Sequence, residues 1–85
     1  MSDKDERFYN AKELIALGRV NTLEELYKQV PKKVIAETLN LNATRFSNYK
    51  SNLPGEFKFS EIVELSKALE TDILVIVRIF VNSMK

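Results

Sequence analysis

The chain has neither cysteine nor histidine, and these two absences exclude several kinds of functional site. Disulfide scaffolds and thiol nucleophiles require cysteine, Ser-His-Asp triads require histidine, and zinc fingers require one or both. The acidic pairs Glu24–Glu25 and Glu61/Glu64 fit solvated helix faces, so no pair of carboxylates is expected in a pocket. We therefore expect that the protein is not an enzyme and that it holds no metal and no small-molecule cofactor.

Long apolar runs are also missing. The longest, ILVIV at 73–77, is far shorter than the roughly 20 residues that a membrane helix needs. The N-terminal sequence MSDKDER is charged and is followed by no apolar segment, so we expect no secretory signal. With 85 residues, of which 45% are hydrophobic and 29% charged, the composition is typical of one soluble globular domain. We expect a cytoplasmic protein with no membrane association, and the lack of cysteine fits that reducing compartment.

The net positive charge is small overall, and the excess of basic residues lies in the middle of the chain. The net charge of the whole chain is only +1. Residues 28–58 carry six basic and two acidic side chains, a net charge of +4, whereas residues 1–27 and 59–85 have net charges of −2 and −1. Such an asymmetry indicates a surface that attracts a polyanion.

Helix signals recur along the chain and predict an all-α fold with five or six short helices. The sequence TLEE at 22–25 is a capping box, in which the Thr22 hydroxyl and the Glu25 carboxylate cap backbone N–H groups at the start of a helix. We expect residues 1–21 to form an N-terminal segment with one short helix, over about 8–17, and residues 22–85 to form the main globular unit. The further expected helices are 23–29, 31–39, 43–51, one capped by Ser60, and a last segment after Thr71 and Asp72.

That last segment, ILVIVRIFVNSM at 73–84, is compatible with either a helix or a strand. Its many β-branched residues favour a strand, whereas its caps and its all-helical context favour a helix. In either case a segment that is apolar on every side needs more covering than a small domain offers. We therefore expect a homodimer whose interface includes this C-terminal segment.

The stretch VIAETLNLNATRFSNYK at 34–50 reads as two helices joined by a short turn. Asn40 can form the tight turn because asparagine tolerates a left-handed backbone conformation, and Asn42 is a good N-cap for the second helix. A helix, a short turn and a second helix form the unit that inserts its second helix into the major groove of DNA.

The second helix of this unit, expected over 43–51, has two different sides. At about 100° per residue, Phe46 and Tyr49 lie on one side with Leu53 beyond them, and we expect all three to face the core. Short polar side chains lie on the opposite side, and Arg45 and Lys50 flank them. The outward polar set is Thr44, Ser47, Asn48 and Ser51. Such side chains can form hydrogen bonds with base edges, and arginine can bind guanine or a phosphate.

The sequence PKKVIAETLNLNATRFSNYKSN at 31–52 resembles the Cro/repressor-type helix-turn-helix family, which is also called XRE-like and has the lambda-repressor-like fold. The matching features are Ile35-Ala36, the turn at Asn40-Leu41, the polar run 42–45 and the aromatic pair Phe46 and Tyr49. The resemblance continues through FSEIVELSKALETD at 59–72 and covers roughly residues 22–80. It departs from the family pattern at Asn40, Ala43 and Lys50, where glycine, a long polar residue and an acidic residue are usual.

The resemblance implies a small bacterial or phage transcriptional regulator that binds double-stranded DNA in a sequence-specific manner as a dimer. Lys32 and Lys33 lie in the first turn of the expected helix 31–39, where exposed N–H groups already favour a phosphate. Lys58 is a further candidate for phosphate contact. The predicted DNA-binding residues are Lys32, Lys33, Asn42, Ala43, Thr44, Arg45, Ser47, Asn48 and Lys50.

A second interpretation keeps the same fold but gives it a protein partner. The apolar C-terminal segment could then bind another protein, as in an antitoxin or a co-regulator. Binding to RNA is a weaker third possibility, because the aromatic residues near the polar run are assigned to the core. The sequence does not distinguish a repressor from an activator.

Overall fold

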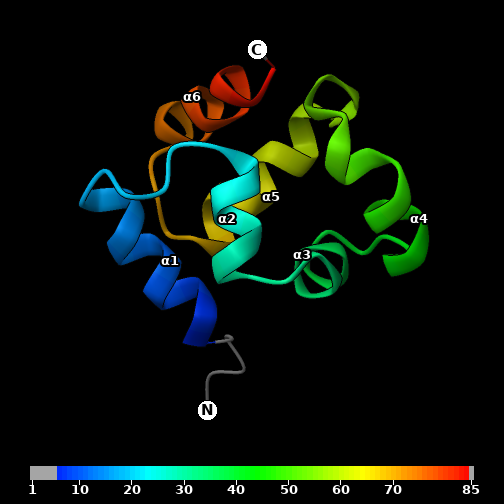
Figure 1. Ribbon diagram of the computed structural model, residues 1–85, viewed down its shortest axis with the longest axis horizontal. Helices are drawn as coiled ribbons and strands as arrows, with labels where there is room; N and C mark the ends of the chain where they lie inside the picture. Colours follow the sequence, from blue (N-terminus) through cyan, green and yellow to red (C-terminus); the bar gives the residue numbers. More distant parts are fainter. Residues whose placement is uncertain (1–5, 85) are drawn as a thin grey trace.

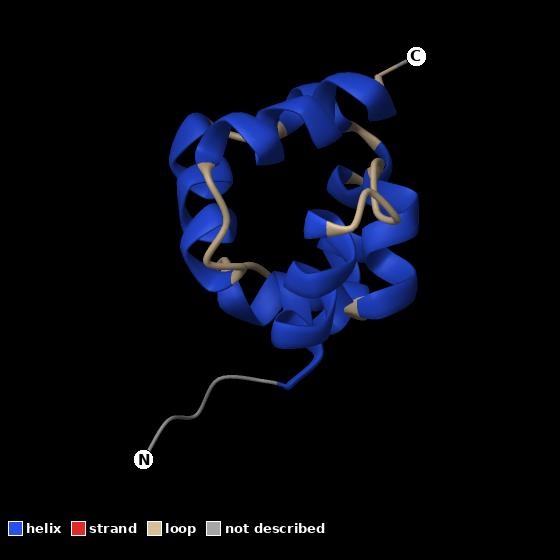
Figure 2. Ribbon diagram, turned by 90° about the vertical axis from the view of Figure 1, so that its left-hand side faces the viewer, coloured by secondary structure: helices blue, strands red, loops and turns tan. Residues whose placement is uncertain are grey.

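A computed structural model of the chain describes residues 6–84, and every regular element in these residues is helical (Figure 2). The elements are α1 (Glu6–Ala16), α2 (Leu23–Gln29), α3 (Lys32–Thr38), α4 (Ala43–Asn48), the 3-10 helices η1 (Lys50–Asn52) and η2 (Pro54–Glu56), α5 (Phe59–Ala68) and α6 (Ile73–Ser83). The predicted all-α fold is confirmed. The helix predicted within 1–21 is α1, and residues 1–5 of that predicted segment lie outside the described residues.

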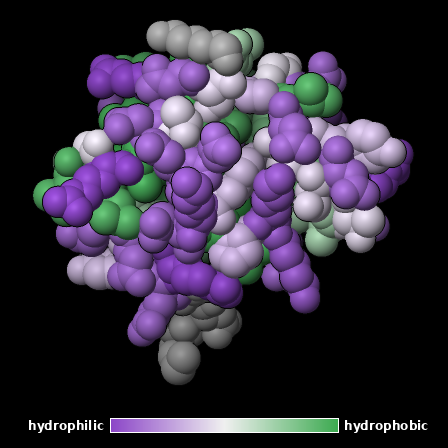
Figure 3. Space-filling view, viewed as in Figure 1, coloured by the Kyte–Doolittle hydropathy of each residue, from purple (hydrophilic) through white to green (hydrophobic). Residues whose placement is uncertain are grey.

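The helices surround one hydrophobic core, and Figure 1 shows how they are arranged. In this view α1 and α2 lie on the left and in the centre, α3 and α4 on the right, and α6 along the top, while α5 passes behind α2. The space-filling view shows mostly hydrophilic side chains over α2 and α3, with smaller hydrophobic patches towards the edges (Figure 3). None of the helices in residues 6–84 is long and apolar enough to cross a bilayer.

The predicted capping box begins α2. The Glu25 N–H donates to the Thr22 hydroxyl oxygen at 3.2 Å, and the N–H groups of Asn21 and Thr22 donate to Glu25 Oε1 at 2.7 and 3.2 Å. Pro31 keeps the preceding residue, Val30, in an extended conformation with a φ of −127°. Because Pro31 itself occupies the N-cap position of α3, α2 and α3 follow each other with only two residues between them.

Two tight turns of the same kind connect α3 with α4 and α5 with α6. Asn40 and Glu70 have positive φ values of 59° and 49°, which places both in the left-handed region. The residue after each turn closes it, because the Leu41 N–H donates to Ala36 O at 2.8 Å and the Thr71 N–H donates to Ser66 O at 3.0 Å. The turn predicted at Asn40 is confirmed.

A chain of aromatic rings runs through the core and joins elements that are distant in the sequence. The ring centroids of Tyr27 and Phe46 are 6.3 Å apart, those of Phe46 and Phe57 are 5.8 Å apart, and those of Phe57 and Phe80 are 4.7 Å apart. All three pairs meet edge to face, the geometry that aromatic rings prefer. These rings link α2, α4 and α6 through one packed row.

The last segment is the helix α6, so the strand alternative is wrong. Ile76, Ile79 and Phe80 fall at helical spacing and are buried, and together they give the helix an inner face that outweighs the β propensity of its residues. The Ser83 hydroxyl donates to Ile79 O at 2.7 Å and accepts from the Leu23 N–H at 2.8 Å. The bond between the Leu23 N–H and the Ser83 hydroxyl connects the end of α6 with the start of α2.

The N-cap predicted for α5, Ser60, lies two residues after the observed one, Lys58. The helix begins at Phe59, so Ser60 lies inside its first turn and Lys58 occupies the N-cap position. Glu61 explains the earlier start, because its Oε1 accepts the Lys58 N–H at 2.8 Å. At α6 the predicted Asp72 occupies the N-cap position without a side-chain bond, and the Thr71 hydroxyl donates to Leu69 O instead.

Candidate nucleic-acid interface

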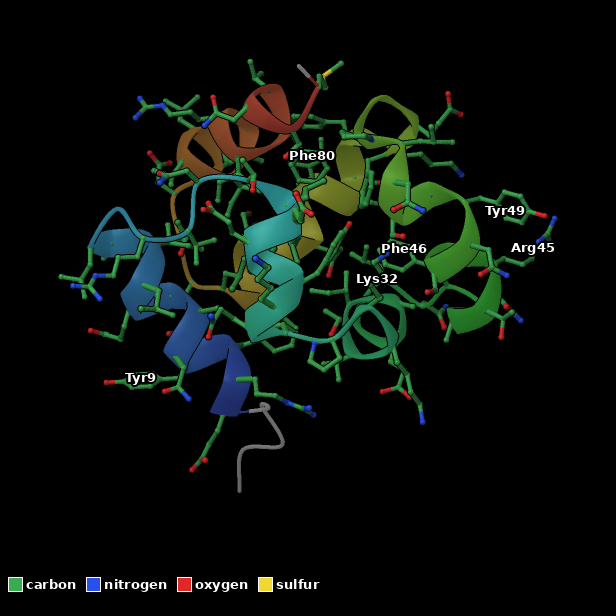
Figure 4. All side chains as sticks on the ribbon, in the orientation of Figure 1. Tyr9, Lys32, Arg45, Phe46, Tyr49 and Phe80 are labelled. Carbon is green, nitrogen blue, oxygen red and sulfur yellow. The ribbon has the colours of Figure 1, made fainter. Side chains whose placement is uncertain are left out.

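The helix-turn-helix unit consists of α3, the turn at Leu39–Asn42, and α4. Ala36 is fully buried, and its carbonyl accepts the Leu41 N–H, which brings the two helices close together at a small side chain. Phe46 is 2% exposed and points from α4 into the core (Figure 4). The inner anchors of the unit are therefore Ala36 and Phe46, and the prediction that Phe46 faces the core is confirmed.

The start of α4 is capped as predicted. The Asn42 side-chain oxygen accepts the Arg45 N–H at 2.9 Å. This bond uses the acceptor of the Asn42 side chain and leaves its NH₂ group at the exposed end of the helix. Asn42 thus fixes the first turn of α4, the part of a recognition helix that is nearest to bases in helix-turn-helix complexes.

The outward face of α4 is rotated relative to the predicted one. Thr44, Arg45, Asn48 and Tyr49 are exposed, whereas Ala43 and Ser47 are only partly exposed. Figure 4 shows Arg45 and Tyr49 projecting from α4 in the same direction, away from the body of the molecule. We call Thr44, Arg45, Asn48 and Tyr49 the outer face of α4. Among the described residues, the side chains of this face make no hydrogen bond or ion pair.

The prediction that Tyr49 and Leu53 face the core is wrong, because Tyr49 is 67% exposed and Leu53 is 50% exposed. The predicted helix 43–51 also ends early, at Asn48. Tyr49 departs from helical geometry with a φ of −127° and a ψ of −75°, and the chain then tightens into η1.

Ser51 explains the early end of α4. It was predicted to face outwards, but it is 3% exposed. Its hydroxyl donates to Ser47 O at 2.9 Å, and its carbonyl accepts the Tyr27 hydroxyl at 3.1 Å. The small serine therefore takes the inner position after Phe46, and the larger Tyr49 is turned out to solvent. Burial raises the pKa of the Tyr27 phenol well above its usual range, so Tyr27 remains a hydrogen-bond donor in this contact.

Lys32 is held in a defined place at the start of α3, whereas Lys33 next to it is exposed. The Lys32 Nζ lies 5.4 Å from the centroid of the Tyr27 ring and donates to Asn52 Oδ1 at 3.4 Å. A cation over an aromatic face loses side-chain freedom but keeps its charge. The structure therefore joins Lys32 of α3 with Asn52 of η1, a residue that is not among the predicted DNA-binding residues.

Lys50 has an internal partner, which sequence reasoning did not anticipate. Its Nζ contacts both carboxylate oxygens of Glu61 at 2.8 Å, and the two side chains are 23% and 10% exposed. Burial alone would raise the pKa of the Glu61 carboxyl. The hydrogen bonds from Lys50 and from the Lys58 N–H, with the charges of both lysines, outweigh burial and lower this pKa below its usual value. Lys50 is thus neutralised locally by Glu61.

Two hollows border the unit. One, of about 500 Å³, lies between α2, η1 and the end of α6. Its lining includes Tyr27, Lys32, Asn52 and Ser83. The other, of about 360 Å³, lies along α4 and is lined by Leu41, Asn42, Arg45, Phe46, Tyr49 and Lys50. The second is called the α4 groove below.

The basic side chains near the helix-turn-helix unit differ in whether they have a carboxylate partner. Lys33 and Arg45 are exposed and, within residues 6–84, have no carboxylate partner, whereas Lys50 is paired with Glu61.

Residues 6–84 contain no cluster of carboxylates that could hold a metal ion. No protein-family model, no curated protein and no solved structure matches this chain.

Proposed function

We propose that the protein binds double-stranded DNA with α4 in the major groove and acts as a transcriptional regulator of the Cro/repressor type. The observation that carries this proposal is the outer face of α4. Thr44, Arg45 and Asn48 present hydrogen-bonding groups without partners in the described structure, on a helix that is capped at one end and anchored through Phe46. Base edges in the major groove would supply the missing partners.

The size of α4 suits this task. A helix of six residues is about 9 Å long, and the major groove of B-DNA is about 12 Å wide. Thr44, Arg45 and Asn48 occupy its first and second turns, so all three would reach into the groove together. In this proposal Arg45 reads guanine or contacts a phosphate, and Asn48 is suited to the two adjacent hydrogen bonds that adenine offers.

Phosphate contacts would supply most of the affinity. Lys33 is exposed, and Lys32 is held beside Asn52 at the same end of the unit, so a DNA backbone could meet a cation from α3 and an amide from η1 together. The predicted contacts at Asn42, Ala43 and Ser47 remain part of this proposal, with less exposed side chain at Ala43 and Ser47. Lys50 stays a prediction, and its pairing with Glu61 makes it the weakest member of the set.

The proposal includes a second copy of the chain as a partner. Leu74 and Val81 are seven residues apart on α6 and share an exposed face that also carries Arg78, and Met84 follows at the C-cap of the helix. The side chains of Leu74, Val81 and Met84 are 70%, 52% and 61% exposed. A helix face with such large apolar side chains in water is typical of a protein–protein interface. A symmetric pair built on this face would present two copies of α4 to two half-sites of one DNA duplex.

The test of DNA binding is the dependence of affinity on salt. We expect the affinity for short duplex DNA to fall steeply between 50 and 200 mM salt, by roughly 0.9 in logarithmic slope for each phosphate contact. Lys33→Ala and Arg45→Ala should each lower that slope by about 0.9 if both contact phosphates. Lys67→Ala, which removes an exposed cation from the far end of α5, is the matched control and should leave the slope unchanged. Absence of binding at low salt would overturn the proposal.

A second candidate function is a protein-interaction module on the same fold, such as an antitoxin or a co-regulator. The exposed face of α6 favours it, because that face would serve a different protein as well as a second copy. Lys32→Glu combined with Lys33→Glu separates the two functions. This pair of changes should abolish binding to DNA and leave binding through α6 intact, and a loss of both activities together would count against separate surfaces.

A further inference from the structure

The α4 groove is lined by both apolar and positively charged side chains. The apolar residues of its lining are Leu41, Tyr49 and the almost fully buried Phe46. Of the two cations that line it, Lys50 is paired with Glu61, whereas Arg45 has no carboxylate partner within residues 6–84. Tyr49 is the most exposed of the three apolar residues, and it lies next to Arg45 on the outer face of α4 (Figure 4). A ligand that fits must therefore offer an apolar group within a negatively charged surrounding.

We propose that Tyr49 and the α4 groove contact the 5-methyl group of a thymine in duplex DNA. Of the groups that base pairs present in the major groove, only the thymine methyl is apolar, and it lies between two phosphate backbones. This inference rests on the proposed function and deepens it, because it names one base that α4 would select. It also gives a role to a side chain that the fold leaves largely in water.

The polar residues that line the groove favour a base over an apolar side chain of a partner protein. Asn42 and Arg45 are part of the lining, and the Asn42 NH₂ group and the Arg45 guanidinium have no hydrogen-bond partner among the described residues. An apolar side chain entering the groove would leave those groups unsatisfied, whereas the edge of an A·T pair offers a methyl group together with donors and acceptors. Arg45, which lines the groove, suits an adjacent phosphate.

The test compares thymine with uracil, which lacks only the methyl group. Duplexes that bind are first selected from a random-sequence pool with the purified protein. Each thymine of the selected sequence is then replaced by uracil in turn, and the affinity of each duplex is measured. Loss of one buried methyl group should weaken binding about four-fold at one position of each half-site, with little change elsewhere. Replacing that uracil by thymine again restores the affinity.

The protein variant Tyr49→Ser completes the test. With this variant, thymine and uracil at the sensitive position should bind equally, because the wall of the groove is gone. Tyr9→Ser is the matched control, since Tyr9 is also an exposed tyrosine but lies on α1. It should keep the four-fold preference. Both changes remove exposed side chains, so neither is expected to unfold the domain.

The possible outcomes distinguish the role of Tyr49 from the proposed binding to DNA. Selection that enriches no thymine, uracil substitutions without effect, or a preference that survives in Tyr49→Ser would each overturn the role of Tyr49. In those cases salt-dependent binding of the wild-type protein to duplex DNA would still support the proposed function. If the wild-type protein binds no duplex at low salt, both proposals fail together. Capture of an apolar peptide by the wild type but not by Tyr49→Ser, with no thymine preference, would assign the groove to a protein partner.

Discussion

The ion pair between Lys50 and Glu61 allows a quantitative test of how η1 is attached to α5. Replacing Glu61 with Gln removes the negative charge but keeps an oxygen that can accept the Lys58 N–H. Replacing Lys50 with Met keeps an unbranched side chain over the Phe57 ring, from which Lys50 Nζ lies 5.8 Å. The two variants therefore remove the same attraction from opposite sides while preserving most of the packing.

The magnitude follows from the geometry and from the exposure of the pair. Two unit charges 2.8 Å apart attract by roughly 6 kcal/mol at an effective dielectric constant of about 20. Desolvation of the two groups opposes most of this, and hydrogen bonds to charged groups contribute about 1.5–3 kcal/mol net. Glu61→Gln should cost about 1–2 kcal/mol, because Lys50 can turn towards water. Lys50→Met should cost about 2–3 kcal/mol, because it leaves a carboxylate that is only 10% exposed without its cation.

The pH dependence gives the same test a second readout. The pKa of Glu61 in the folded protein lies below its usual value of 4.5, so the ionised carboxylate stabilises the fold at all pH values above that usual pKa. This contribution is lost as the pH falls through the lowered pKa of the folded state. The difference in unfolding free energy between wild type and Glu61→Gln should therefore be constant near neutral pH and shrink below about pH 4.5.

The assay is urea unfolding followed by circular dichroism at 222 nm, at pH 7 and at pH 3. Glu64→Gln is the matched control, because Glu64 is exposed and lies 3.9 Å from Lys67 on the same helix. That change should cost less than about 0.5 kcal/mol at both pH values. Equal costs for Glu61→Gln and Glu64→Gln, or a Lys50→Met variant as stable as the wild type, would refute the reasoning.

Four further substitutions, at three positions, test the turn at Asn40, the contact between α3 and α4, and the exposed face of α6. Asn40→Gly should be neutral or raise the unfolding free energy slightly. Asn40→Val should lower it by about 1–2 kcal/mol, because a β-branched residue is strained at a φ of 59°. Urea unfolding of the two variants and the wild type measures the difference. Ala36→Leu should cost about 1–3 kcal/mol in the same assay, since the site is fully buried between α3 and α4. Leu74→Lys should abolish self-association in sedimentation at tens of micromolar while leaving the far-UV spectrum unchanged, and a variant that associates like the wild type would remove α6 from the dimer proposal.

Local sequence signals gave most of the elements correctly. The capping box at Thr22 and Glu25, the left-handed turn at Asn40 and the N-cap at Asn42 each depend on a few neighbouring residues, and each is present in the structure. The burial of Phe46 was also predictable, because it follows from helical spacing within one element. Features that depend only on residues close together in the sequence were therefore predictable.

The features that were missed depend on contacts between distant parts of the chain. Tyr49 is turned out because Ser51 takes the inner position, and Ser51 is held there by Tyr27, which lies 24 residues earlier. Lys50 has a partner 11 residues later in Glu61. A helical wheel drawn for residues 43–51 assumes that the helix continues through all of them, so it assigned Tyr49 to the wrong side.

The row of aromatic rings makes the orientation of α4 depend on the rest of the fold. Phe46 on α4 packs against Phe57, and Phe57 packs against Phe80 on α6, with centroid distances of 5.8 and 4.7 Å. Well-packed rings in a core hold the elements that carry them in a fixed relation. Under the proposed function, α6 would set the position of the second copy and α4 would meet the DNA. The distance between two α4 helices in such a dimer would then be fixed by these rings, and with it the spacing of the half-sites that the protein selects.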